Sequence, residues 1–317
     1  MPLNCAILDD YQNVAMTCAD WSNALPDVAV SVFHDTVSGE ALAERLSPFD
    51  IIVAMRERTR FDADLLAQLP RLRLLVTTGM KNASIDMTAA ATRGITVCGT
   101  ASEGHPTSEL AWGLLLALAR KIPQEDTALR AGFWQTTLGI DLHGKTLGLV
   151  GFGRVAGMMA RYALAFGMDV IAWSRSLTDE AAVERGVRRA QGLSELLGEA
   201  DIVSLHVPLN ETTRHMIDAE ALRQMKPTAL LLNTSRAGVV DTAALASALY
   251  AGKIAGAGVD VHDSEPLAVP SALTSAPNTV LTPHLGYVSQ NNYARYYGDA
   301  AEDIRCWIDG AAVRVLT

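Results

Sequence analysis

Three polar side chains follow three successive apolar runs in the second half of the chain. They are Arg236 after Ala229–Asn233, Glu265 after Ile254–Val259, and His284 after Thr279–Leu281. If these runs are parallel strands, their carboxyl ends meet at one edge of the sheet, where such sheets bind ligands. Each residue alone has a structural explanation, as a surface arginine, a turn before a proline or a loop histidine. Their shared position favours a functional site.

The three residue types suit the reduction of a 2-keto acid. An arginine fork can grip a carboxylate and polarise the adjacent carbonyl oxygen. A histidine beside a carboxylate is held in one orientation and favours its protonated form, so it can donate a proton near neutral pH. A bound nicotinamide would supply the hydride. The sequence therefore predicts Arg236, Glu265 and His284 as catalytic residues.

A dinucleotide site is predicted where the chain reads Gly151-Phe-Gly153-Arg-Val-Ala. The apolar run Leu147–Val150 precedes this turn, and a helical pattern and a second apolar run, Val170–Trp173, follow it, as in a nucleotide-binding βαβ unit. Gly151 permits the tight turn, Gly153 lets the backbone approach a pyrophosphate, and the helix N-terminus favours phosphate. The alternative is an ordinary tight turn, but the flanking elements favour the nucleotide.

The residues that follow the expected strand Val170–Trp173 influence which cofactor can bind. NAD enzymes of this type usually end that strand with an acidic residue that binds the ribose and repels a 2′-phosphate. This chain has Ser174 and Arg175 there instead. Arg175 could pair with a 2′-phosphate or lie flat on the adenine. We therefore expect NAD(P) as the cofactor and lean towards NADPH.

Apolar runs alternate with helical patterns along the whole chain, which predicts an α/β fold with parallel sheets. Five strands and three helices are expected in residues 1–100, and six strands in a doubly wound Rossmann-type domain over residues 101–288. The apolar helix Glu103–Lys121 is expected to end at Pro123 and to be buried between domains or subunits. A last helix is expected over Gln290–Ile308.

Composition narrows the possible partners. The chain has 317 residues, 49% of them hydrophobic, and a net charge of −9, which argues against nucleic acid or an anionic membrane as partner. The four cysteines form no C-x-x-C pair, so no metal site is expected. The N-terminus has no basic region and no apolar run could span a bilayer, so we expect a cytoplasmic protein.

The chain resembles the D-isomer-specific 2-hydroxyacid dehydrogenase family over essentially its whole length. The resemblance is carried by five blocks in order: GKTLGLVGFGRVA, DIVSLHVPLNETTRHMI, LLNTSRAGVVD, GAGVDVHDSEPL and TVLTPHLGY. It implies a homodimer that interconverts a 2-keto acid and a D-2-hydroxy acid. It also implies a smaller flavodoxin-like substrate-binding domain built from residues 1–100 and 289–317 around the nucleotide domain.

The resemblance also assigns roles to residues. Arg236 would anchor the substrate, and Glu265 would support His284 as the acid/base. Arg56, Met80 and Lys81 would complete the substrate site. Cofactor contacts would come from Gly151, Gly153, Arg154, Val155, Ser174, Arg175, His206, Val207, Pro208, Thr212, Thr234, Ser235, Arg236, Asp260, His284 and Gly286. The loop after Met80 departs from the family pattern, in which a glycine pair precedes Asp-Asn.

Two alternatives remain on the same scaffold. Formate dehydrogenases share the fold but pair their histidine with a glutamine, whereas Glu265 is acidic. A nucleotide-sensing corepressor-like binding protein could keep all three polar residues. Such proteins add long polar tails, which are not seen in this sequence.

Overall fold

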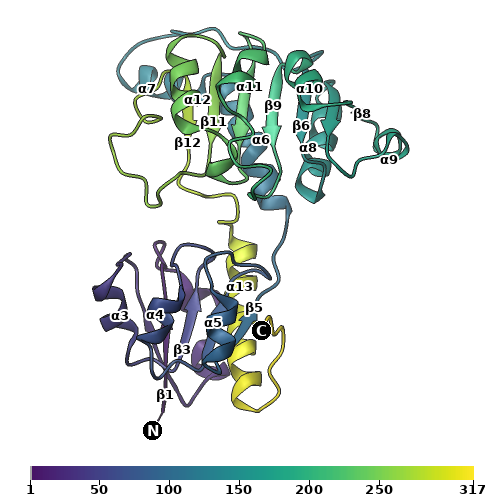
Figure 1. The fold of residues 1–317 in the computed structure, drawn as a ribbon. Helices are drawn as coiled ribbons and strands as arrows, with labels where there is room; N and C mark the ends of the chain where they lie inside the picture. Colours follow the sequence, from purple (N-terminus) through teal and green to yellow (C-terminus); the bar gives the residue numbers. More distant parts are fainter. Residues whose placement is uncertain (1) are drawn as a thin grey trace. The chain divides into compact units, whose positions relative to one another are not determined.

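The computed structural model describes residues 2–317. It contains two compact units, each with its own parallel sheet (Figure 1). Unit 1 comprises the chain up to Glu103 together with Ser289–Thr317, and unit 2 comprises Gly104–Val288. The α/β class and the two parallel sheets predicted from the alternating pattern are confirmed.

Unit 1 is built on a five-stranded sheet of order β2-β1-β3-β4-β5, in which every neighbouring pair is parallel. Its strands are β1 (Leu3–Ile7), β2 (Val28–Val32), β3 (Ile51–Ala54), β4 (Leu74–Thr77) and β5 (Thr96–Gly99). This order is the flavodoxin-like one. Val, Ile and Leu dominate the strands because both faces of the sheet are covered.

The helices of unit 1 lie on the two faces of this sheet. They are α1 (Ala15–Cys18), α2 (Trp21–Ala24), α3 (Glu40–Leu46), α4 (Ala63–Ala67), α5 (Met87–Thr92) and α13 (Gln290–Ile308). Helices α3, α4 and α5 share one core cluster with alternate residues of the strands. Helix α13 contacts β4, α1 and α2. Aspartates cap α4 and α5, since the Asp62 and Asp86 side chains accept hydrogen bonds from backbone N–H groups of the first turn.

Unit 2 is built on a seven-stranded parallel sheet of order β12-β11-β10-β9-β6-β7-β8. Its strands are β6 (Thr146–Val150), β7 (Asp169–Trp173), β8 (Arg188–Arg189), β9 (Ile202–Leu205), β10 (Leu230–Asn233), β11 (Gly256–Val259) and β12 (Thr279–Leu281). The direction of winding reverses between β6 and β9. Doubly wound sheets bind ligands beyond the carboxyl ends of their strands at such a switch point.

Helices cover both faces of the second sheet. They are α6 (His105–Ala119), α7 (Ile122–Arg130), α8 (Arg154–Ala165), α9 (Asp179–Glu184), α10 (Leu193–Glu199), α11 (Ala219–Gln224), the short 3-10 helix η1 (Ala237–Val239) and α12 (Thr242–Tyr250). One core cluster joins the sheet to α6, α8 and α9, and another joins it to α10, α11 and α12. Helices therefore cover both faces of the sheet, and the loops that follow the strands lie at its carboxyl edge.

The structure corrects three expectations. The second sheet has seven strands rather than six, because two arginines form the short edge strand β8 beside β7. The apolar helix ends at Ala119, and Pro123 lies in the first turn of α7, where a missing N–H costs no hydrogen bond. Five helices rather than three lie in residues 2–100, because α1 and α2 are four residues each, too short to show a periodic apolar pattern. Helix α6 packs on β10, β11, β12 and α8 within unit 2.

Within residues 2–317, no helix combines the length and the apolar character that crossing a membrane requires.

Candidate active site

His284 and Glu265 form a hydrogen-bonded pair beyond the ends of neighbouring strands. Glu265 lies in the loop after β11, and His284 lies three residues beyond β12. The Nδ1 atom of His284 is 2.7 Å from Oε2 of Glu265, and the two side chains are 21% and 30% exposed. Because Nδ1 faces the carboxylate, Nε2 is the ring nitrogen that remains for exchanging a proton with a ligand. This is the arrangement that the sequence predicted for an acid/base.

Glu265 is held in its ionised form. Burial acts to raise the pKa of its carboxyl, but the hydrogen bond and charge of His284 and the backbone N–H of His262 outweigh burial, so the pKa is lowered. The N–H of His262 donates to Oε1 at 2.9 Å, which fixes the carboxylate from its second oxygen. Since the folded pKa lies below the unfolded one, this pairing stabilises the fold above the unfolded pKa. The stabilisation is lost as pH falls through the folded pKa.

Asp260 fixes the loop that carries His284. Its side chain is fully buried and accepts hydrogen bonds from the Thr282 hydroxyl at 2.6 Å and from the N–H groups of Leu285 and Gly286 at 2.7 and 2.8 Å. Burial raises the pKa of Asp260, against the opposing effect of these donors. His284 itself has a left-handed backbone with φ of 55°, which is uncommon for a residue other than glycine. Asp260 thus holds the histidine loop in a strained conformation.

Arg236 lies in a turn that follows β10, the strand next to β11. The buried side chain of Asn233 organises this turn, since its Nδ2 donates to the Arg236 carbonyl and its Oδ1 accepts from the backbone and hydroxyl of Ser235. The Nη1 atom of Arg236 donates to the Ser235 carbonyl at 2.7 Å. Strands β10, β11 and β12 are adjacent and parallel, so the three predicted catalytic residues follow neighbouring strand ends.

The glycine turn lies at the switch point of the sheet. Gly151 has a φ of 86°, and a Cβ there would lie 2.7 Å from the carbonyl oxygen of His206, so only glycine fits. Gly153 has open space where its Cβ would be, and it precedes α8 without a side-chain cap. Uncapped N–H groups at a helix start, next to an open backbone, form a cradle suited to a pyrophosphate.

Two further observations fit a bound nucleotide. The hydroxyl of Thr234 is buried and has no hydrogen-bond partner within residues 2–317, although buried hydroxyls usually have one. Burial lowers the pKa of His206 to about 4, so its ring is neutral at physiological pH, and its Nε2 pairs with the Ser204 hydroxyl at 2.9 Å. The buried Thr234 hydroxyl and the neutral ring of His206 could both make polar contacts with a cofactor bound at the glycine turn.

The second strand of the nucleotide unit, β7, ends without an acid. Ser174 follows it half-buried, and the Nη1 atom of the exposed Arg175 lies 3.3 Å from the Thr212 hydroxyl. Asn210 orients Thr212 by accepting from both its N–H and its hydroxyl. Thr212 comes from the loop after β9, so residues from two strand ends meet here.

The other predicted cofactor contacts lie in the loops after β6, β9, β10 and β12. Arg154 and Val155 begin α8, and Val207 and Pro208 follow β9 directly. The side chain of Val207 packs where a Cβ on Gly151 would lie. Ser235 belongs to the turn organised by Asn233, and Gly286 to the loop held by Asp260.

The predicted substrate residues Arg56, Met80 and Lys81 belong to unit 1. Arg56 directly follows Met55 at the end of β3, and its backbone is left-handed with φ of 52°. Met80 and Lys81 follow β4 and are both exposed, Met80 to 46%. They therefore lie beyond the carboxyl ends of neighbouring strands of the first sheet.

The sequence reasoning missed the residues that hold the site residues in place. Asn233 ends β10 and reads as part of the strand, while His262 reads as one of several polar residues in a loop. Their roles arise from hydrogen bonds to backbone groups, which leave no pattern of spacing. The one available signal was a polar residue at the end of an otherwise apolar run. Among residues 2–317, no cluster of three or more His, Cys, Asp or Glu could hold a metal ion.

Comparisons with known proteins agree with this geometry. The family model described as "D-isomer specific 2-hydroxyacid dehydrogenase, NAD binding domain" matches residues 112–286. A glyoxylate reductase of Aeropyrum pernix is 40% identical over 261 residues, which is 79% of this chain and 78% of that protein.

Solved structures share the fold. A crystal structure from Ralstonia solanacearum, described as a "putative D-3-phosphoglycerate dehydrogenase oxidoreductase", is 35% identical, with a TM-score of 0.94 over 99% of this chain and 96% of that one. An acyclic imino acid reductase in complex with NADPH and D-Arg is 27% identical, with a TM-score of 0.78 over 99% and 100% of the chains. The chain therefore belongs to the D-isomer-specific 2-hydroxyacid dehydrogenase family and is an NAD(P)-dependent 2-hydroxyacid dehydrogenase.

Proposed function

We propose that the chain reduces a small 2-keto acid, with glyoxylate as the first candidate, to the corresponding D-2-hydroxy acid. The observation that carries this proposal is the His284–Glu265 pair at the carboxyl edge of the sheet, 2.7 Å apart, beyond strands next to the one that Arg236 follows. The 40% identity to a glyoxylate reductase over most of both chains supports glyoxylate in particular.

Each residue has one task in the proposed reaction. Arg236 is the proposed anchor of the substrate carboxylate in unit 2. Arg56, Met80 and Lys81 are the proposed substrate residues of unit 1, which is the proposed substrate-binding domain. The nicotinamide ring, when bound, supplies the hydride. His284 donates a proton from Nε2 to the keto oxygen as the hydroxyl forms, and Glu265 stabilises the protonated ring before the transfer.

A panel of 2-keto acids tests the substrate. We expect the highest kcat/KM with glyoxylate and lower values as the group beside the carbonyl grows, for example with pyruvate, hydroxypyruvate and phenylpyruvate. A preference for a bulky keto acid would reject glyoxylate while keeping the reaction class. Cofactor binding without turnover of any acid would instead favour a nucleotide-sensing binding protein.

We further propose that NADPH is preferred over NADH. Ser174 and Arg175 stand where an acid would repel a 2′-phosphate, and the Thr212 hydroxyl accepts a hydrogen bond from Arg175 at 3.3 Å, which holds the guanidinium at this position. The solved relative in complex with NADPH, at 27% identity, is consistent with this preference. The competing arrangement has the guanidinium stacked on the adenine, where it would favour neither cofactor.

The variant Arg175→Ala distinguishes the two arrangements. If Arg175 pairs with the 2′-phosphate, the ratio of kcat/KM for NADPH over that for NADH should fall at least about tenfold, which corresponds to about 1.4 kcal/mol for one charge-assisted contact. If it stacks on adenine, both values fall together and the ratio is unchanged. Thr212→Val is the matched control and should lower the ratio less, because it removes no charge.

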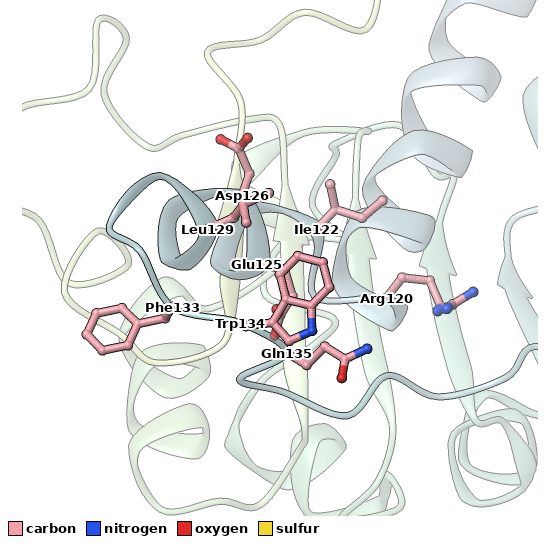
Figure 2. A pocket seen from close by; sticks show the side chains of 8 residues that line it. All are labelled: Arg120, Ile122, Glu125, Asp126, Leu129, Phe133, Trp134 and Gln135. Carbon is pink, nitrogen blue, oxygen red and sulfur yellow. The ribbon is translucent and has the colours of Figure 1, made fainter.

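We also propose that the chain forms a homodimer. Helix α7 and the residues after it expose several apolar side chains, among them Phe133 and Trp134, which Figure 2 shows. Trp134 is 77% exposed, and Leu138 further along the chain is 92% exposed. A contiguous exposed apolar patch commonly marks a protein interface. Sedimentation should give twice the 33.8 kDa mass of one chain, and Leu138→Asp should shift it towards the monomer. A monomer at micromolar concentration would reject the proposal.

A further inference from the structure

The loop between β4 and α5 holds Arg56 at three of its groups. The backbone N–H of Arg56 donates to the Thr78 hydroxyl at 2.8 Å, and its Nη1 donates to the Thr78 carbonyl at 3.0 Å. The Nδ2 atom of Asn82 donates to the Arg56 carbonyl at 2.5 Å. One short loop thus contacts the residue at both ends of its backbone and at the tip of its side chain.

These contacts hold a conformation that the chain would not adopt alone. An arginine with φ of 52° lies in the left-handed region, which costs about 1 kcal/mol or more for a residue with a Cβ. Such a conformation persists only where surrounding groups over-determine it. Thr78 and Asn82 supply those groups, one to the N–H and one to the carbonyl.

Gly79 makes room for the guanidinium. A Cβ on this residue would overlap Nη1 of Arg56, so the absence of a side chain is required for the arginine to lie where it does. The N–H of Gly79 is itself fixed, because it donates to the Thr100 hydroxyl at 2.8 Å. The guanidinium therefore rests against a rigid backbone.

Both polar atoms of the Asn82 side chain make hydrogen bonds in this loop. Its Nδ2 also donates to the Thr77 hydroxyl at 2.8 Å, and its Oδ1 accepts from the N–H of Ser84 at 2.8 Å. It therefore ties together the end of β4, the loop at Ser84 and the carbonyl of Arg56. Asn82 lies in the stretch where this chain departs from the family pattern, and neither the predicted roles nor the proposed function uses it.

We propose that Asn82 is a positioning residue that acts on the 2-keto acid through Arg56. It locks the left-handed backbone of Arg56 and so sets the guanidinium in place before the substrate arrives. This inference rests on the proposed role of Arg56 in binding the substrate. Preorganisation lowers the ordering cost of binding, so its loss should appear mainly in KM.

The test compares steady-state kinetics of Asn82→Ala, Arg56→Ala and the double variant, with glyoxylate and NADPH. Asn82→Ala should raise KM for glyoxylate about five- to tenfold, the size of one lost hydrogen bond that orders a charged ligand contact. Its KM for NADPH should not change. In the Arg56→Ala background, the Asn82→Ala change should have no further effect on KM, because the group it positions is gone.

Two more variants keep the test decisive. Ser84→Ala is the matched control, since its hydroxyl donates to the carbonyl of Glu57 from the same loop, and it should leave KM within about twofold of wild type. Asn82→Asp keeps the shape and the bond from the Ser84 N–H but loses both donors. It should raise KM like Asn82→Ala, even if the alanine variant fails to fold.

The outcomes separate the inference from the proposed function. If Arg56→Ala raises KM and both Asn82 variants leave it unchanged, Asn82 has no positioning role. If Asn82→Ala raises KM by the same factor with and without Arg56, it acts on something else, and the inference is wrong. If Arg56→Ala itself leaves KM unchanged, the proposed role of Arg56 fails, and the inference fails with it.

Discussion

Replacing His284 by alanine should lower kcat for keto-acid reduction by about a hundredfold or more, which is the usual size of a general acid–base contribution. The reason is that Nε2 of His284 is the proposed proton donor, held in place by the 2.7 Å contact of Nδ1 with Glu265. The KM for the cofactor should change little. The measurement is steady-state turnover with a 2-keto acid, and turnover near the wild-type rate would end this assignment.

The pH dependence provides an independent check on the same residue. Reduction needs the protonated ring and oxidation needs the neutral ring, so the reductive optimum should lie at lower pH than the oxidative one. Glu265→Gln is a control of matched shape that removes the negative charge beside the ring. It should move the decline of reductive activity to lower pH, since the carboxylate no longer favours the charged imidazole. An unmoved profile would mean that the carboxylate acts only by orientation.

Replacing Arg236 by lysine should raise KM for the keto acid about thirty-fold, which corresponds to about 2 kcal/mol for a lost hydrogen bond between charged groups. An ammonium keeps the charge but cannot make the two parallel bonds of a guanidinium to a carboxylate. Cofactor affinity should change little. Titration of the variant with NADPH, followed by fluorescence, separates the two effects.

Two results with Arg236→Lys would contradict the proposed role of Arg236. An unchanged KM would show that the carboxylate is held elsewhere, by Arg56 and the loop at Met80. An equal loss of affinity for cofactor and substrate would indicate that the Asn233-organised turn had collapsed. Melting temperature distinguishes that collapse from a local effect.

Much of the fold could be predicted because its strands are short apolar runs in a chain of alternating pattern. The run Thr279–Leu281 matches β12 residue for residue, and the runs Leu147–Val150 and Val170–Trp173 match β6 and β7 to within one residue. Sheets covered on both faces leave such runs as their clearest signal. The proposed catalytic residues Arg236, Glu265 and His284 were chosen by the same logic, since residues after parallel strands share one edge of the sheet.

The missed features depend on tertiary context. Strand β8 consists of Arg188 and Arg189, which no strand pattern indicates, and it exists because its backbone pairs with β7. Pro123 reads as the end of a helix, but proline is equally suited to the first turn of the next one. The left-handed backbones of Arg56 and His284 could not be inferred from residue type. Asn82 donates to the carbonyl of Arg56 from 26 positions away, and Asp260 bonds the residues on either side of His284 from 24 positions away.

One measurement tests the central claim most directly. The chain is incubated with glyoxylate and NADPH, and glycolate is quantified against the cofactor consumed, with NADH and the His284→Ala variant run in parallel. We predict one glycolate for each NADPH oxidised, less turnover with NADH, and a rate for the variant lower by about a hundredfold or more. Binding of either cofactor without its oxidation by glyoxylate or any other 2-keto acid would contradict the proposed activity.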